Sequence, residues 1–172
     1  GWPERVDIIK WINRILSWEP NARIVLHGVS MGAATVLMAS GEDLPGNVKA
    51  VIADCGYTSE WDEFQREADA LHIPWFPVLN ATSVLSKIRD GYDFKQASAL
   101  AQVKKSRIPT LFIHGSSDEL VPYSMLGELY AAAACEKEEL TVEGAGHALS
   151  SSVAPTLYWR KVEDFIAKYL DR

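Results

Sequence analysis

A serine lies between two glycines where an apolar run gives way to an alanine-rich stretch. Gly28, Ser30 and Gly32 form the pattern Gly-x-Ser-x-Gly directly after residues 23–27. Such a strand-to-helix turn strains the backbone so that the serine hydroxyl projects from the sheet, and the glycines avoid clashes across the turn. Ser30 would also lie at a helix N-terminus, which favours negative charge. The pattern predicts a nucleophilic serine; a serine-capped helix with incidental glycines is the alternative.

A serine hydroxyl is a weak nucleophile and needs a neighbouring base. His147 follows a predicted strand in a glycine-rich loop, which would let its imidazole turn back toward Ser30. The positions of the other three histidines indicate packing, surface or structural roles. These residues are His27 in the strand before the serine, His72 in a long intervening segment and His114 at a strand end. We therefore predict that His147 is the general base.

The base needs a carboxylate that orients its imidazole. Asp118 comes shortly after another predicted strand and is the expected acid. Glu119 is a rival that is expected on the surface, and Asp54 is a second rival at the end of a different strand. Ser30, Asp118 and His147 then each follow a different strand, a coincidence far more specific than any single motif.

The elements that must position these residues alternate between strand and helix. A first helix opens at Pro3 and stops before Glu19-Pro20-Asn21. Strands are predicted at residues 23–27, 48–53, 110–114 and 139–142, and further helices at 30–40, 122–134 and 155–170. This order predicts an α/β fold of three layers, α/β/α, with a mostly parallel sheet. In such sheets, ligand sites lie beyond the carboxyl ends of the strands.

The interval 57–108 breaks the alternation and is too long for an ordinary connection. We predict that the chain is a single domain over residues 1–172, with a helical insertion at about 57–108 above the carboxyl edge of the sheet. Tyr57 could line the site. Four aromatic residues could form an apolar acyl pocket above the serine or simply fill a small core, and they are Trp61, Phe64, Trp75 and Phe76.

The composition limits the partners of this chain. A formal net charge of -6 argues against nucleic acid. Cys55 and Cys135 belong to no ligand cluster, so no metal is expected, and two buried free thiols are favoured over a disulfide. No apolar run approaches the ~18–20 residues of a membrane span, and the first residues do not resemble a signal peptide.

The sequence resembles the α/β-hydrolase superfamily, and more closely the bacterial serine hydrolases grouped with the prolyl-oligopeptidase and serine-aminopeptidase branch. The phrases that carry the resemblance are GVSMGAATV at 28–36, DCGYTS at 54–59, IPTLFIHGSSDELVP at 108–122 and GAGH at 144–147. It covers nearly the whole chain and is weakest in the insertion, which in this family varies and helps to choose substrates. The resemblance implies no metal and no organic cofactor.

The resemblance also implies a mechanism for carboxyl esters or small acyl compounds. Ser30 would attack the acyl carbonyl, His147 would transfer the proton, Asp118 would orient the imidazole, and the backbone N–H of Met31 would be one oxyanion donor. A peptidase or amidase of the same fold differs only in its leaving group and is an alternative. A non-catalytic or inactive fragment, which binds a ligand or assembles with another chain, is a second alternative.

The chain differs from the family at its N-terminal end. Family members have several strands before the serine strand, and a loop among them supplies a second oxyanion donor. We therefore expect a truncated fold that lacks the N-terminal strands, with a rate lowered by about 10²–10³ for the lost donor. The exposed strand at 24–26 or the first helix would favour a homodimer. The compartment stays open, cytoplasmic or anchored through an absent N-terminal segment.

Overall fold

The structure is a computed structural model that describes residues 1–170 of the chain. Its strands are β1 (Ile24–Val29), β2 (Val48–Asp54), β3 (Thr110–Gly115) and β4 (Lys137–Val142). Its helices are α1 (Glu4–Trp18), α2 (Met31–Ser40), α3 (Glu60–Ala70), α4 (Trp75–Asp90), α5 (Ala99–Val103), α6 (Ser124–Ala132), α7 (Ser150–Val153) and α8 (Pro155–Leu170). The predicted strands and helices are all present, and their ends lie within two residues of the expected positions.

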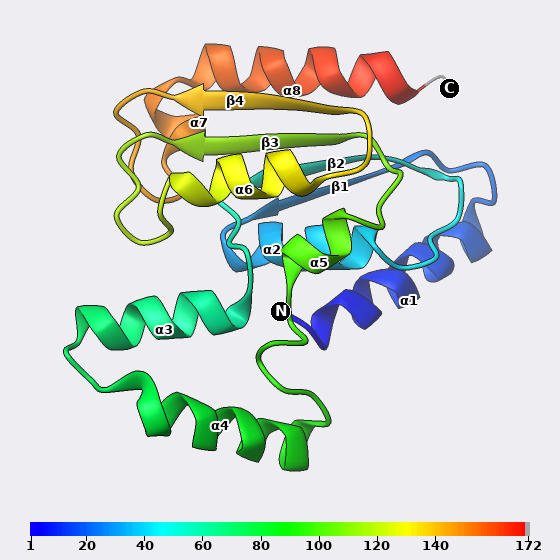
Figure 1. Cartoon of the computed structure of the whole chain (residues 1–172). Helices are drawn as coiled ribbons and strands as arrows, with labels where there is room; N and C mark the ends of the chain where they lie inside the picture. The colour runs from blue at the N-terminus through cyan, green and yellow to red at the C-terminus, as the bar shows by residue number, and fades with distance from the viewer. Residues whose placement is uncertain (171–172) are drawn as a thin grey trace.

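The sheet has four strands in the order β1-β2-β3-β4, and every pair is parallel. Parallel neighbours require crossover connections, which the intervening helices supply. All carboxyl ends therefore meet at one edge (Figure 1). The prediction of an α/β fold with a parallel sheet between helical layers is confirmed.

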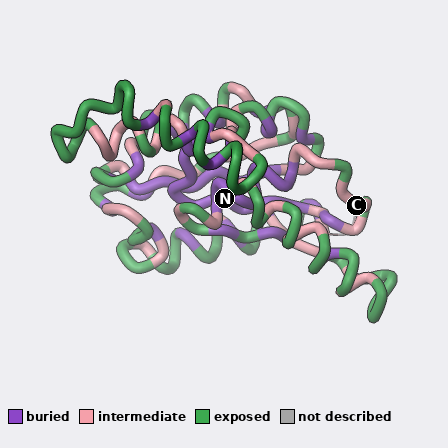
Figure 2. Tube along the Cα trace, turned by 90° about the horizontal axis from the view of Figure 1, so that it is seen from below, coloured by how far each residue is buried: buried purple, intermediate pink, exposed green. Residues whose placement is uncertain are grey.

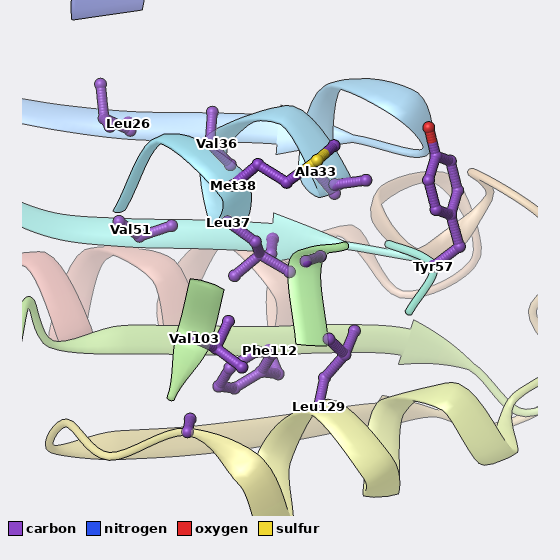
Figure 3. Close-up of a cluster of buried hydrophobic side chains, with 14 of the residues drawn as sticks. Leu26, Ala33, Val36, Leu37, Met38, Val51, Tyr57, Val103, Phe112 and Leu129 are labelled. Atoms are coloured by element: carbon purple, nitrogen blue, oxygen red, sulfur yellow. The ribbon is translucent and has the colours of Figure 1, made fainter. Parts of the chain in front are cut away.

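Helices cover both faces of this sheet. Helix α8 lies on one face, while α1, α2, α5 and α6 lie on the other (Figure 1). The larger core cluster fills the second side, where Leu37 and Met38 of α2 contact the layer that contains Phe112 of β3 (Figure 3). Residues of α2 are buried from Ala33 onward, so the helix that follows the serine is held rigidly against the sheet.

Buried residues run through the middle of the molecule, and exposed residues surround them (Figure 2). Within the predicted insertion, α5 belongs to the helical layer that covers one face of the sheet, because it packs against α2. Helices α3 and α4 instead lie apart from the sheet (Figure 1). An isolated antiparallel bridge between Ser59 and Ser98 joins the two ends of the segment that contains α3 and α4. We therefore propose that the helical insertion proper spans residues 60–97.

Strand β1 lies at an edge of the sheet in the part of the chain that is described. An edge strand offers backbone groups that can pair with another chain. We expect the 172-residue chain to form a dimer through β1 or the neighbouring α1 at high concentration. Light scattering over a dilution series would test this, and a mass equal to the 19.1 kDa monomer at every concentration would contradict it.

Candidate active site

Ser30 occupies a strained turn between β1 and α2. Its φ of 56° and ψ of -120° lie in a region that non-glycine residues rarely adopt. The turn is fixed because the Ser30 backbone N–H donates to the carbonyl oxygen of Asp54 at 2.8 Å, at the end of the neighbouring strand. The Ser30 hydroxyl does not cap α2, so it is left to another partner.

The two glycines around Ser30 have different surroundings. A Cβ added to Gly28 would lie 2.2 Å from the backbone oxygen of Gly32, far inside van der Waals contact. A Cβ added to Gly32 would meet nothing within 4 Å. The expectation that both glycines avoid a clash is therefore right for Gly28 and wrong for Gly32, because only the former faces backbone across the turn.

His147 connects the serine to Asp118. Its Nε2 lies 2.7 Å from the Ser30 hydroxyl oxygen, and its Nδ1 lies 2.9 Å from Oδ2 of Asp118. The three residues follow β1, β3 and β4, so the carboxyl edge of the sheet brings them together as predicted from the sequence. Asp118 is buried, whereas the His147 side chain keeps 20% of its surface exposed on the solvent side.

Backbone donors fix the orientation of the Asp118 carboxylate. Its Oδ1 accepts from the backbone N–H groups of Leu120 and Val121 at 3.0 and 2.9 Å, which directs Oδ2 toward His147. His114 lies beneath, with its Nε2 3.0 Å from the Val121 carbonyl oxygen and 3.2 Å from Oδ2. Because a carbonyl can only accept, Nε2 of His114 carries the hydrogen. The expected structural hydrogen bond of His114 is therefore present.

The rival residues are engaged elsewhere or exposed. Asp54 is buried and accepts from the Ser150 hydroxyl at 3.2 Å, and burial raises the pKa of its carboxyl group. His27 lies 3.0 Å from the Tyr158 hydroxyl on α8, and burial lowers the pKa of its imidazole. Glu119 and His72 are exposed on the surface. The bond from His147 thus goes to Asp118 rather than to either rival acid.

Met31 follows the serine as the first residue of α2. The first backbone N–H groups of a helix have no partner within it and are favourable for anions. Ala34 is the first residue whose N–H bonds back along the turn, to the Ser30 carbonyl at 3.1 Å. The position of Met31 is therefore compatible with its predicted role as an oxyanion donor.

A cavity of about 480 Å³ opens beside Ser30 and Met31 under helix α3. Tyr57 lines it, as the sequence suggested. Of the four aromatic residues considered for an acyl pocket, Phe64 lines this cavity, whereas Trp61, Trp75 and Phe76 do not. The four aromatics thus do not form one pocket above the serine.

The cavity is acidic, a property that the sequence reasoning missed. Carboxylates of Glu60, Glu63 and Glu67 line it from α3, and burial raises the pKa of Glu60. Arg66 compensates part of this charge through ion pairs with Glu63 at 2.8 Å and Glu67 at 2.7 Å. Their spacing of three and four residues places all three glutamates on one helix face, and this helical period was the signal available.

One group of possible metal ligands includes the same residues. Cys55, Asp118 and His147 offer ligand atoms within 4.8 Å of one another. Asp118 and both ring nitrogens of His147 are already engaged in the hydrogen bonds that lead to Ser30, which leaves Cys55 as the one member of the group outside that path. The donor set therefore fits a hydrogen-bonded serine site better than a metal centre. Among the described helices, none is long and apolar enough to cross a membrane.

The parallel sheet, the strained serine turn and the residues at three strand ends define an α/β hydrolase. Within that class, the sequence model of the prolyl oligopeptidase family matches residues 4–172. The chain belongs to this family.

Two curated proteins are similar to this chain over nearly its whole length. The uncharacterized protein YqkD of Bacillus subtilis is 30% identical over 169 residues, covering 96% of this chain and 55% of the relative. The α/β hydrolase domain-containing protein WAV2 of Arabidopsis thaliana is 30% identical over 182 residues, covering 98% and 56%. The chain thus spans about half the length of the curated relatives it matches.

Solved structures with the same fold are less similar in sequence. A Pyrococcus furiosus esterase, Pf2001, has a TM-score of 0.73 at 18% identity, over 97% of this chain and 62% of the esterase. A Pyrococcus horikoshii acylaminoacyl peptidase has a TM-score of 0.71 at 18% identity, over 97% of this chain and 28% of the peptidase. At this identity they support the fold alone.

Proposed function

We propose that the chain is a serine hydrolase that cleaves carboxyl esters or small acyl compounds through an acyl-enzyme on Ser30. The observation that carries this proposal is the continuous path from the Ser30 hydroxyl to His147 at 2.7 Å and from His147 to Asp118 at 2.9 Å. A nucleophile, a base and an orienting acid within hydrogen-bond reach form the arrangement that acyl transfer requires.

The proposed chemistry proceeds in two halves. The Ser30 oxygen attacks the acyl carbonyl while Nε2 of His147 takes the hydroxyl proton, and the Met31 N–H donates to the oxyanion. The intermediate collapses as the imidazolium returns that proton to the leaving group. Water then adds to the acyl-enzyme, giving its proton to His147, and the carboxylic acid departs as Ser30 regains a proton.

Asp118 acts in this proposal as an electrostatic and tautomeric partner. Its Oδ2 accepts from Nδ1–H of His147, which leaves Nε2 unprotonated and able to receive the serine proton. The two backbone bonds to Oδ1 hold the carboxylate in this orientation. In this proposal Asp118 orients His147 because its carboxylate accepts from Nδ1–H, and His147 acts as the base because its Nε2 is free to accept the serine proton.

A peptidase or amidase is the second candidate, because the family and one structural neighbour include peptidases. An amide differs from an ester in a leaving group that must be protonated as it departs. The geometry of Ser30 and His147 serves both reactions equally. Parallel assays with esters and with aminoacyl amides of the same acyl group would separate the two.

We predict that a fluorophosphonate forms one adduct with the wild-type chain and none with Ser30→Ala. The phosphorus reacts with an activated serine, and His147 at 2.7 Å supplies the activation. Intact-mass measurement on folded protein reads the result directly. A folded wild-type chain without an adduct would instead favour the third candidate, a non-catalytic fragment that binds a ligand or a partner chain.

A further inference from the structure

A second, apolar cavity of about 280 Å³ lies between α3 and α4. Ala68 contributes to its wall from α3, Trp75 and Val78 from α4, and Phe94 from the segment that follows α4. Thr82 brings a hydroxyl, which already donates to the Val78 carbonyl at 2.9 Å. The walls therefore present hydrocarbon, a surface that water solvates poorly and that an aliphatic group would cover favourably.

Phe64 lines both this apolar cavity and the cavity beside Ser30, so the two cavities adjoin at this residue. The ring packs against Phe94 with 4.7 Å between centroids, yet the residue keeps 42% of its surface exposed. A chain bonded to Ser30 that passed this ring would leave the acidic cavity and enter an apolar one. Phe64 is thus the residue that an acyl chain on Ser30 would have to pass in order to reach the insertion.

From this arrangement we infer that the cavity between α3 and α4 binds the aliphatic chain of a medium-chain acyl group. The inference rests on the proposed function, since it assigns the acyl side of the substrate. The acyl chain stays covalently attached to Ser30 after the leaving group departs, so it is the part that must be held through both halves of the reaction.

The volume sets the length of chain that fits. An apolar cavity of about 150 Å³ is large enough to bind benzene, with six carbons. The 280 Å³ between α3 and α4 therefore holds on the order of ten carbons. The first carbons of the acyl group would remain in the larger cavity, so chains of roughly eight to twelve carbons are expected to gain the most from this cavity.

The first test compares p-nitrophenyl esters of two, four, eight and ten carbons, which share one leaving group. Ala68→Trp fills the cavity from α3, and Ala70→Trp places the same ring at an exposed position of α3 that does not line it. In the wild type and in Ala70→Trp, kcat/KM should rise mainly between four and ten carbons, by up to about fourfold for each methylene that enters the apolar cavity. In Ala68→Trp, the two-carbon ester should change less than twofold, while the ten-carbon ester should lose at least tenfold.

Val78→Trp fills the same cavity from α4 and should reproduce the selective loss, even if Ala68→Trp does not fold. Equal losses for short and long esters, or a flat chain-length profile in the wild type, would overturn the inference. Hydrolysis of the acetate ester with a flat profile contradicts only the chain-binding cavity. Failure to cleave any ester contradicts the proposed function.

A binding measurement tests the aliphatic-chain site between α3 and α4 independently of the proposed hydrolase activity. In the Ser30→Ala background no hydrolysis occurs, and 1-octanol should raise Tm in a concentration-dependent way whereas 1-butanol at the same concentration should not. Adding Ala68→Trp should abolish the octanol effect, and adding Ala70→Trp should preserve it. An octanol effect that survives Ala68→Trp, or no octanol effect at all, would refute the inference whatever the esterase assays show.

Discussion

Asp118→Asn is expected to lower kcat by about 10⁴-fold at neutral pH without unfolding the protein. The asparagine carbonyl can take the place of Oδ1 and accept from the backbone N–H groups of Leu120 and Val121. The amide nitrogen then points at Nδ1 of His147 in place of Oδ2. Because an amide nitrogen donates, Nδ1 must accept, and the hydrogen moves to Nε2.

The consequence is a histidine that holds the wrong tautomer. With hydrogen on Nε2, the imidazole cannot take the proton of the Ser30 hydroxyl 2.7 Å away. KM should change little, because Asp118 is buried beneath His147 and does not line the substrate cavity. A steady-state assay with one ester, read as kcat and KM separately, would show the split.

Asp54→Asn is the matched control for this prediction. Asp54 is also a buried aspartate after a strand, but its carboxylate is bonded to Ser150 rather than to His147. Its activity should stay within about tenfold of the wild type, since no catalytic tautomer depends on it. If Asp54→Asn lost as much kcat as Asp118→Asn, the assignment of the orienting acid would be wrong.

The positions of the three strand-end residues could be predicted because a parallel sheet brings the carboxyl ends of its strands to one edge. Once the alternation of strand and helix is read, Ser30, Asp118 and His147 must converge at one edge. The same reasoning ranked His114 as structural, and its bond to the Val121 carbonyl agrees. These inferences depend on topology, which a hydrophobic pattern encodes strongly.

The insertion was less predictable because its helices do not pack on the sheet. Phe64 and Trp75 both looked like candidates for one pocket. Both line the cavity between α3 and α4, but Phe64 also lines the cavity beside Ser30 and Trp75 does not. How far α3 tilts over the sheet edge decides which side chains face Ser30, and no pattern within α3 specifies that tilt. The spacing of the glutamates predicts that α3 has an acidic face, but it does not predict that this face lies toward Ser30.

Gly28→Ala is expected to lower the free energy of unfolding by roughly 3 kcal/mol or more and to abolish measurable esterase activity. The new methyl group would lie 2.2 Å from the Gly32 oxygen and 2.6 Å from the Ala33 nitrogen, both backbone atoms that cannot rotate away. Helix α2 would have to shift off β1 to make room. Since α2 is buried against the sheet, that shift opens core contacts and moves Ser30 away from His147.

Gly32→Ala, in the same motif, is the control that makes this prediction specific. Its added Cβ has open space, and an alanine in the first turn of α2 should raise the free energy of unfolding by up to about 1 kcal/mol. Urea unfolding of the two variants, with esterase rates on the same samples, compares them directly. Equal destabilisation by both substitutions would mean that the motif needs glycine for backbone freedom at both positions. A loss confined to Gly28→Ala would mean that one close backbone contact, between the end of β1 and the start of α2, sets the geometry of the serine.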